Sequence, residues 1–232
     1  MSLSDDLKQD VLKIFRDKWE TRDGTVVPDT GDLKLGNEAV KLKGTVLYAD
    51  LVESTKLVDE KKHHFAAEIY KSFLICACRV IRYHGGEITA FDGDRVMAVF
   101  IGDRKNQSAM KAALHINYTV LKIVNPKLKE VYQNETYSVR HAVGIDTSEI
   151  WVARTGIRGS NDLVWVGRSA NYAAKLCSLR ENNYSSWVTG TVYDNSHDSA
   201  KYSSEKQELM WEKRTWTKYN MTVYRSSWWH TF

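Results

Sequence analysis

The sequence predicts a single soluble α+β domain. Segments with helical periodicity alternate with short apolar strands, and no glycine-rich linker separates them. The 232 residues include 33 Lys and Arg, 29 Asp and Glu, and 43% hydrophobic residues, which gives a formal net charge of +4. This balance excludes a disordered chain, which combines low hydrophobicity with high net charge. With 13 Gly and 2 Pro the chain is not collagen-like.

The N-terminal part of the chain is expected to form an extension over residues 1–40, followed by the main domain over 41–232. Apolar residues at helical spacing predict an amphipathic helix over residues 3–19. An isolated helix of this length is marginal in water, so we expect it to pack against another surface. Residues 21–37 include Pro28, Gly31 and Gly36, and predict a loop.

The main domain is predicted to alternate strands with helices. The helix after the first strand should end at His84-Gly85-Gly86, and the helix before Asn125-Pro126 should end there. From Trp187 onward the pattern is one of short strands and polar turns. We expect strands at 45–51, 87–91, 95–101, 137–145, 149–154 and 163–166, and helices at 61–83, 107–124 and 168–179.

The environment is predicted to be the cytoplasm. The chain has three cysteines, Cys76, Cys78 and Cys177. Because this number is odd and the first two are too close together for a zinc site, free thiols are expected. The first twenty residues lack the apolar region of a signal peptide, and no apolar run approaches the roughly 20 residues of a membrane span. Lysines and arginines are dispersed, so neither a membrane nor a nucleic acid is an expected partner.

Two aspartates at the ends of neighbouring predicted strands are the sharpest chemical feature. Asp50 closes the strand that ends in Tyr48-Ala49-Asp50, and Asp94 lies in the turn Asp92-Gly93-Asp94. Paired carboxylates suit hard divalent cations, and two such ions can clamp the attacking and leaving oxygens of a phosphoryl transfer. The following segment Leu51–Thr55 leads into a helix, where backbone N–H groups could meet a triphosphate. The alternative is that both aspartates only cap turns.

A second group of polar residues shares one helix face. Arg168, Asn171 and Lys175 are spaced by three and four residues, so two cations and an amide converge on one surface. The alternative is an ordinary solvated helix face. The common glycine-rich phosphate loops are absent from the sequence, so phosphate binding would depend on metals and helix N-termini.

Three segments resemble the core motifs of the class III nucleotidyl cyclases: GTVLYADLVEST (44–55), HGGEITAFDGDRVMAVF (84–100) and VWVGRSANYAAKL (164–176). The resemblance covers about residues 45–179 in the family's order and spacing. It implies a palm-like mixed sheet flanked by helices. It also implies active sites formed between two head-to-tail copies, and therefore a homodimer.

The resemblance implies a role for each matching residue. Asp50 and Asp94, with Leu51 beside them, would hold two Mg²⁺ or Mn²⁺ ions. Asn171 would orient the ribose and support the transition state, with help from Arg168. Lys175 replaces an arginine that binds the α-phosphate in the family; lysine offers a point charge where arginine offers a bidentate fork.

The positions that read a purine base depart from the family. Ala90 stands where purine cyclases place a lysine, and Val164 where they place Asp or Thr. Tyr48 shares the strand face of Asp50 and could therefore point toward the substrate, although a core position with a satisfied hydroxyl is equally compatible with the pattern. Tyr-Ala-Asp-Leu before a Ser-Thr pair resembles the bacterial pyrimidine cyclases of the Pycsar antiphage systems, whose cyclic UMP or cyclic CMP switches on a separate effector protein.

The resemblance thus implies a cyclase that converts UTP or CTP to the 3′,5′-cyclic nucleotide and pyrophosphate. A purine cyclase with unusual base contacts and an inactive nucleotide-binding homologue are the alternatives. Lys213 and Lys218 are loose candidates for binding the γ-phosphate. The expected substrate contacts are Tyr48, Val52, Glu53, Ser54, Thr55, Ala90 and Val164.

Overall fold

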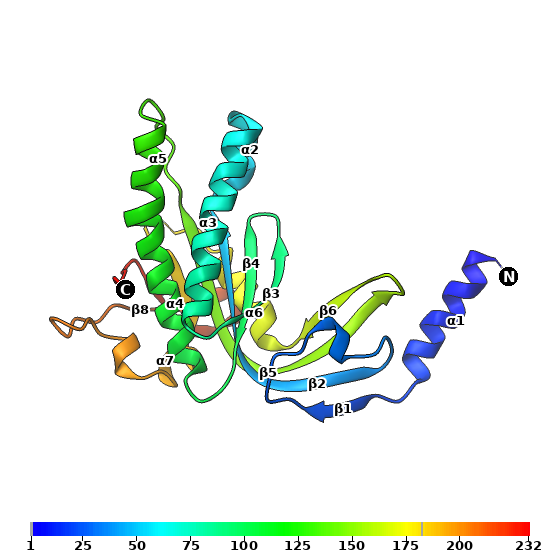
Figure 1. Cartoon of the computed structure of the whole chain (residues 1–232). Coiled ribbons are helices and arrows are strands. Elements are labelled where there is room, and N and C mark those ends of the chain that lie inside the picture. The colour runs from blue at the N-terminus through cyan, green and yellow to red at the C-terminus, as the bar shows by residue number, and fades with distance from the viewer. Residues whose placement is uncertain (1, 182) are drawn as a thin grey trace.

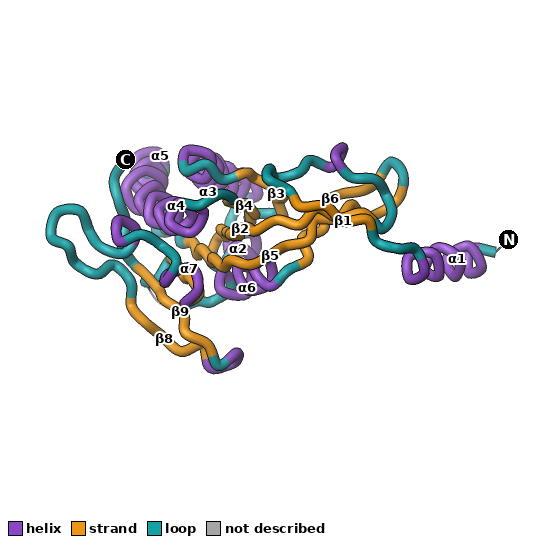
Figure 2. Tube along the Cα trace, turned by 90° about the horizontal axis from the view of Figure 1, so that it is seen from below, coloured by secondary structure: helices purple, strands orange, loops and turns teal. Residues whose placement is uncertain are grey.

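A mixed β-sheet with helices on both faces organises the chain (Figures 1 and 2). The computed structural model describes residues 2–181 and 183–232. Within these residues the strand order is β3-β4-β2-β5-β7-β9-β8, with β1 beside β2 and β6 beside β5. The strands are β1 Glu20–Asp23, β2 Glu38–Leu51, β3 Glu87–Asp92, β4 Arg95–Phe100, β5 His141–Ile157, β6 Ser160–Val166, β7 Ser186–Thr189, β8 Glu212–Trp216 and β9 Met221–Ser226. The α-helices are α1 Leu3–Arg16, α2 Ser54–Glu60, α3 His63–Tyr83, α4 Lys105–Thr119, α5 Asn125–Val131, α6 Arg168–Cys177 and α7 Gly190–Asp194.

The alternation of side chains along β2 divides the core between the two faces of the sheet. Leu47, Ala49 and Leu51 are buried in the apolar cluster that contains α3 and α4. Tyr48 packs against the other cluster, which includes Ala173 of α6. Tyr48 and Asp50 are two residues apart on β2, so both belong to the face that α6 covers. The predicted α+β class, with helices on both faces, is confirmed.

The strand β5 is longer than predicted, because one strand replaces the two expected at 137–145 and 149–154. It pairs with β2 without interruption from Ala39↔Ala153 to Leu51↔His141. The polar residue Asp146 broke the apolar pattern in the sequence, yet it is fully buried. Thr189 and Arg168 donate hydrogen bonds to its carboxylate, which satisfies it inside the sheet.

The predicted helix end at Asn125-Pro126 is wrong. The chain continues from α4 through one π-helical stretch, Val120–Val124, directly into α5. Pro126 lies just after the π-helical stretch, at the junction with α5, where its missing N–H interrupts the backbone hydrogen bonds without ending the helical path. A further short helix, α2, precedes α3 and was not predicted.

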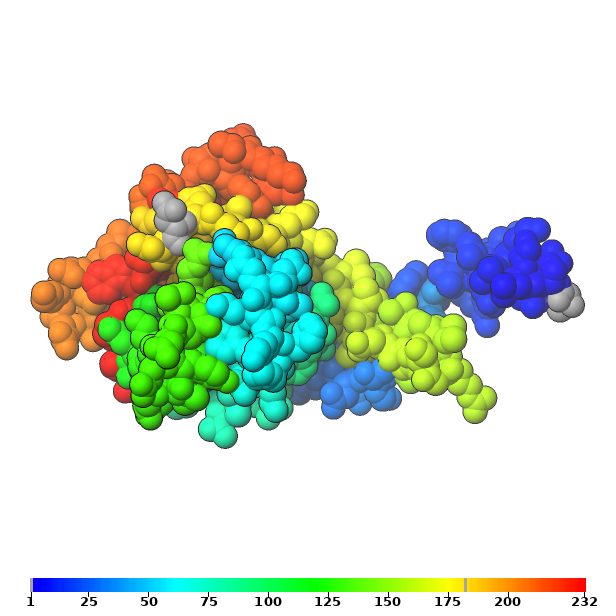
Figure 3. Space-filling view, turned by 90° about the horizontal axis from the view of Figure 1, so that it is seen from above, coloured from blue at the N-terminus to red at the C-terminus, as the bar shows by residue number. Residues whose placement is uncertain are grey.

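The predicted packing of the N-terminal helix against another surface is not seen within the single chain and remains a prediction. None of the residues of α1 is buried, and the helix stands apart from the body of the protein (Figure 3). A capping box between Ser2 and Asp5 supports its start, and Asn37 Nδ2 donates to the carbonyl oxygens of Ile14 and Asp17 at its end. The division of the chain at residue 40 remains a prediction; that position lies within β2. None of the described helices is long and apolar enough to cross a membrane.

The C-terminal segment lies against the ends of α3 and α4, where His115 contacts both His84 and Thr231. His115 Nε2 lies 2.9 Å from the carbonyl oxygen of Thr231, and His115 Nδ1 lies 2.7 Å from Nε2 of His84. Burial, with the charges of His115 and Lys111, lowers the pKa of His84 from 6.5 to about 4. The pKa of His115 is also lowered, chiefly by burial. Both rings are therefore neutral at pH 7.

We expect the free energy of unfolding to fall as the pH drops from about 6.5 toward 4. His84 in the unfolded chain takes up a proton near pH 6.5, but in the folded chain only near pH 4, so acid favours unfolding within this window. The loss attributable to His84 is on the order of 2 kcal/mol. Urea unfolding at pH 7 and pH 5 measures it, and His84→Asn should reduce the difference. An equal pH dependence in the variant would contradict the assignment to His84.

Candidate active site

The carboxylate of Asp50 is buried at the end of β2 between two arginines. Its side chain is 8% exposed, and Oδ2 accepts hydrogen bonds from Nη2 of Arg95 at 3.0 Å and Nη2 of Arg180 at 3.2 Å. The pairing of Ala49 with Val96 brings the start of β4, and so Arg95, to this point. Each guanidinium partly offsets the cost of burying the negative charge.

Asp94 lies in the turn between β3 and β4, next to Asp50. Its Oδ2 is buried and has no hydrogen-bond partner among the described residues. Burial is the main cause that raises the pKa of Asp94; the nearby charge of Asp50 raises it further, while the hydroxyl of Ser54 and the charge of Arg95 lower it. A buried carboxylate oxygen without a partner is suited to receive a cation.

The two carboxylates of Asp50 and Asp94 fit a hard divalent cation that takes its remaining ligands from water and substrate. No group of three or more His, Cys, Asp and Glu side chains gathers anywhere in the described chain, so a complete protein cage is not present there. Mg²⁺ commonly takes one or two carboxylates and completes its shell with water and substrate phosphates. The carboxylates of Asp50 and Asp94 match that requirement. The backbone carbonyl of Leu51 is nearby and accepts from Nη2 of Arg180 at 3.4 Å.

The segment after Asp50 offers fewer free N–H groups than predicted. The Val52 N–H donates to the carbonyl oxygen of Arg140 at 2.9 Å, so Val52 does not provide the phosphate donor assigned to it. Glu53 adopts a left-handed conformation, with φ 61°, and its carboxylate pairs with the guanidinium of Arg140. Ser54 and Thr55 begin α2, and their N–H groups have no carbonyl within that helix to bond. The predicted cradle is thus reduced to the Ser54–Thr55 end.

The polar residues of α6 are not equivalent. Asn171 and Lys175 are exposed, and Lys175 Nζ lies 5.0 Å from the ring centroid of Tyr219. Arg168 is instead bound to the buried Asp146 at 3.2 Å and to the carbonyl oxygen of Thr147 at 2.9 Å. Arg168 therefore anchors the start of α6 to β5, a contact that the sequence did not predict.

Asn171 and Lys175 do not meet the aspartates within one copy. No hydrogen bond or ion pair joins either of them to Asp50 or Asp94 in the part of the chain that the structure describes. Their exposure leaves them free to act on a different surface.

Tyr48 and Ala90 come together across three strands. Tyr48 pairs with Met97 of β4, and Met97 pairs with Ala90 of β3, so the three lie in one row. Burial raises the pKa of the Tyr48 phenol, which is therefore neutral and able to donate a hydrogen bond. Val164 lies apart on β6, paired with Ala153, and is 38% exposed. The small side chain of Ala90 leaves the Tyr48 hydroxyl as the polar group of this row.

Comparison with known proteins places this geometry in a family. No protein-family model matches the chain. A uridylate cyclase of Xanthomonas perforans is 50% identical over 230 residues, which cover 98% of this chain and 98% of that protein. A uridylate cyclase of Burkholderia cepacia is 49% identical over 230 residues, with the same coverage of both chains. The chain belongs to the class III nucleotide cyclases.

Solved cyclase structures share the fold of this enzyme at low sequence identity. The adenylyl cyclase CyaB of P. aeruginosa superimposes with a TM-score of 0.67 at 20% identity, covering 82% of this chain and 95% of that one. The guanylyl cyclase Cya2 gives a TM-score of 0.67 at 15% identity, covering 82% and 94%. The predicted cyclase fold is confirmed.

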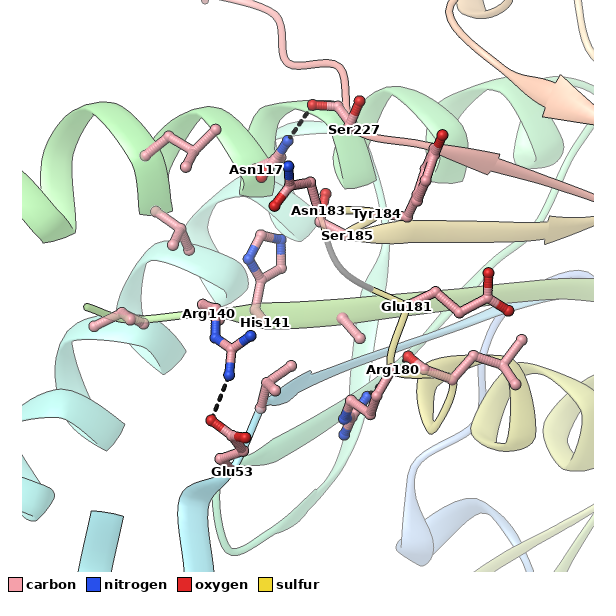
Figure 4. A pocket seen from close by; sticks show the side chains of 16 residues that line it. Glu53, Asn117, Arg140, His141, Arg180, Glu181, Asn183, Tyr184, Ser185 and Ser227 are labelled. Carbon is pink, nitrogen blue, oxygen red and sulfur yellow. Dashed lines mark hydrogen bonds and ion pairs between the residues drawn. The ribbon is translucent and has the colours of Figure 1, made fainter. Parts of the chain in front are cut away.

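Sequence reasoning missed two arginines of this cyclase. Arg140, at the start of β5, and Arg180, after α6, line a cavity of about 560 Å³ beside Asp50 (Figure 4). Neither residue belongs to a motif that the sequence singled out. The position of Arg95 directly after Asp94 was the one available signal that arginine neutralises this site.

Proposed function

We propose that this cyclase converts UTP or CTP, with UTP favoured, to the 3′,5′-cyclic nucleotide and pyrophosphate. The observation that carries the base assignment is the row of Tyr48 and Ala90, in which a neutral phenol is the polar group that can meet a base edge. The names of the relatives, uridylate cyclases at 43–50% identity over nearly the whole chain, support UTP as the substrate and cyclic UMP as the product. Val164 would add an apolar contact.

The active site would be completed by a second copy in a head-to-tail homodimer. Asp50 and Asp94, with Leu51, would hold two Mg²⁺ or Mn²⁺ ions, whose charge would acidify the ribose 3′-hydroxyl and neutralise the phosphates. Asn171 of the second copy would orient the ribose, and Lys175 would lie against the α-phosphate, where negative charge develops. The exposure of both α6 side chains supports this arrangement.

Other residues of the chain would position the substrate. The N–H groups and hydroxyls of Ser54 and Thr55 would meet the phosphates at the start of α2. Glu53 would act through its pair with Arg140, and Arg168 would hold α6 in place through Asp146. The cyclic nucleotide would serve as a cytoplasmic second messenger of antiphage defence that acts on a separate effector protein.

Product analysis tests the proposed function. Purified protein is incubated with Mn²⁺ and each of ATP, GTP, CTP and UTP separately, and the products are identified by mass spectrometry. Conversion of UTP or CTP is the expected result. ATP or GTP as the sole substrate would overturn the base assignment. No product from any nucleotide, with Asp50→Ala behaving identically, would leave an inactive homologue as the remaining interpretation.

Tyr48→Phe should lower kcat/KM for the pyrimidine substrate by roughly 10- to 100-fold, because a base edge would lose its half-buried hydrogen-bond partner. The ratio of kcat/KM for UTP to that for ATP measures the change in selectivity. Tyr118→Phe is the matched control, since Tyr118 lies on α4 against Trp229. Unchanged selectivity in Tyr48→Phe would assign Tyr48 to the core alone.

A further inference from the structure

Three aromatic side chains gather where the turn between β8 and β9 meets α6 (Figure 3). Tyr172 comes from α6, Trp216 ends β8, and Tyr219 lies in the turn that follows. The ring centroids of Trp216 and Tyr219 are 4.4 Å apart, and Tyr172 lies 5.2 Å from Tyr219 and 5.8 Å from Trp216. Favourable aromatic pairs are separated by about 4.5–7 Å, so the three rings form one aromatic cluster.

The fold fixes this aromatic cluster from two sides. Trp216 packs against the buried core that contains Leu176 of α6. After Tyr219, Asn220 adopts a left-handed conformation, with φ 46°, and its N–H donates to the carbonyl oxygen of Thr217 at 3.2 Å. Asparagine enters this region more readily than most residues. The turn is therefore closed by its own backbone, which sets the place of the Tyr219 ring.

The ammonium group of Lys175 lies against two rings of the aromatic cluster. Its Nζ atom is 5.0 Å from the ring centroid of Tyr219 and 5.7 Å from that of Tyr172. Both distances are within the limit of about 6 Å for a cation–π interaction. Among the described residues this ammonium takes part in no ion pair or hydrogen bond. A ring attracts a cation without neutralising it, so Lys175 keeps its charge and its N–H donors for another partner.

An exposed lysine on a helix needs help from its surroundings to place its charge. The ammonium stands on a flexible four-carbon stem and lacks the planar fork that orients a guanidinium. Rings that attract Lys175 restrict its rotamers before a substrate arrives. Charge that is already in place where the transition state becomes negative needs no reorganisation during the reaction.

We propose that Tyr219 is a positioning residue of the cyclase, which holds the ammonium group of Lys175 where negative charge develops during the reaction. Tyr172 supplies the second ring face, and Trp216 fixes the turn that carries Tyr219. Tyr219 acts through Lys175 and needs no contact with the reacting atoms. The proposal rests on the proposed function for the role of Lys175.

Steady-state kinetics with UTP and Mn²⁺ test the role of the Tyr219 ring. Tyr219→Leu should lower kcat roughly tenfold and change KM by less than about threefold, because the misplaced charge is needed most in the transition state. Tyr219→Phe keeps a ring face and should stay within about twofold of wild type. Tyr193→Leu is the matched control, since it removes from α7 a tyrosine ring that lies 5.0 Å from Nζ of Lys201. Circular dichroism melting establishes that each variant is folded.

A double-mutant cycle shows whether Tyr219 acts through Lys175. In the Lys175→Met background, Tyr219→Leu should change kcat by less than about twofold, because two residues that act as a unit are not additive. The Nζ atom of Lys218 also lies 5.7 Å from the centroid of the Tyr219 ring. The same tenfold loss in both backgrounds would overturn the proposal, because Tyr219 would then act through Lys218 or through the turn itself.

Lysine methyl resonances measure the contact without turnover. Reductive methylation with ¹³C-formaldehyde labels each ammonium and leaves it cationic, and the resonance missing from Lys175→Met identifies Lys175. Its methyl protons should be shifted upfield by the rings, and should move downfield in Tyr219→Leu but not in Tyr219→Phe. A resonance that stays in place in Tyr219→Leu would overturn the proposal.

The two measurements together separate failure of this proposal from failure of the proposed function. If the resonance moves and UTP is converted, but Tyr219→Leu keeps the wild-type kcat, the positioning role alone is overturned. If the resonance moves and the wild type converts none of the four nucleoside triphosphates, the proposed function fails and the role of Tyr219 fails with it. A moving resonance with a tenfold loss of kcat and rescue by Tyr219→Phe is the expected result.

Discussion

Asp94→Asn should abolish cyclase activity, by at least about 10³-fold, while leaving the metal-free protein as stable as the wild type or more stable. The two effects have opposite signs because one property of Asp94 causes both. Its carboxylate is half-buried, has a buried Oδ2 without a partner, and lies near the charge of Asp50. Burial and that charge raise the pKa of Asp94, so the ionised form is disfavoured until a cation arrives.

Two measurements on the same samples check this prediction. Urea unfolding in EDTA should give a free energy of unfolding higher by up to about 1 kcal/mol in Asp94→Asn, and initial rates with Mn²⁺ give the activity. Mn²⁺ should raise the melting temperature of the wild type but not that of the variant. Asp92→Asn is the matched control, because Asp92 is exposed in the same turn. A variant that is destabilised without metal would show that Asp94 is a structural residue.

The sequence predicts the aspartates better than it predicts their surroundings. Asp50 and Asp94 sit at a strand end and in a tight turn, features that local patterns reveal. Arg180 reaches Asp50 across 130 positions of the sequence, and no local pattern encodes such a contact. The same limit applies to Arg168 on α6. Its partner Asp146 is buried on β5, and this polar residue separated the two strands that were predicted there.

The helices and strands show the same difference between features set by local sequence and features set by distant contacts. Helices α3 and α6 and strands β3 and β4 have strong periodicity and clear ends, and the structure contains them within a few residues of the predicted ranges. The packing of α1 could not be predicted from its amphipathic pattern, because such a pattern shows that a helix has an apolar face but not what covers it. The engaged N–H of Val52 likewise depends on the register between β2 and β5.

Gly144→Ala should destabilise the protein by about 3 kcal/mol or more, because α6 touches the sheet at this residue. A Cβ atom at Gly144 would lie 2.1 Å from the carbonyl oxygen of Ala173 and 2.3 Å from the backbone nitrogen of Cys177. Both are backbone atoms of α6, so the clash cannot be relieved by rotating a side chain. The helix as a whole must move away from β5.

Movement of α6 would affect the site as well as the fold. Gly144 pairs with Tyr48 on β2, and α6 carries Asn171 and Lys175, so this contact sets the height of α6 above the strand that bears the proposed base contact. A displacement of about 1 Å can cost roughly 10²-fold in rate. Urea unfolding and the rate of cyclic nucleotide formation measure the two effects. Gly31→Ala is the control, because no atom lies within 4 Å of the added methyl group. Wild-type stability and rate in Gly144→Ala would mean that α6 is free to shift, and that its contact with β5 does not position the site.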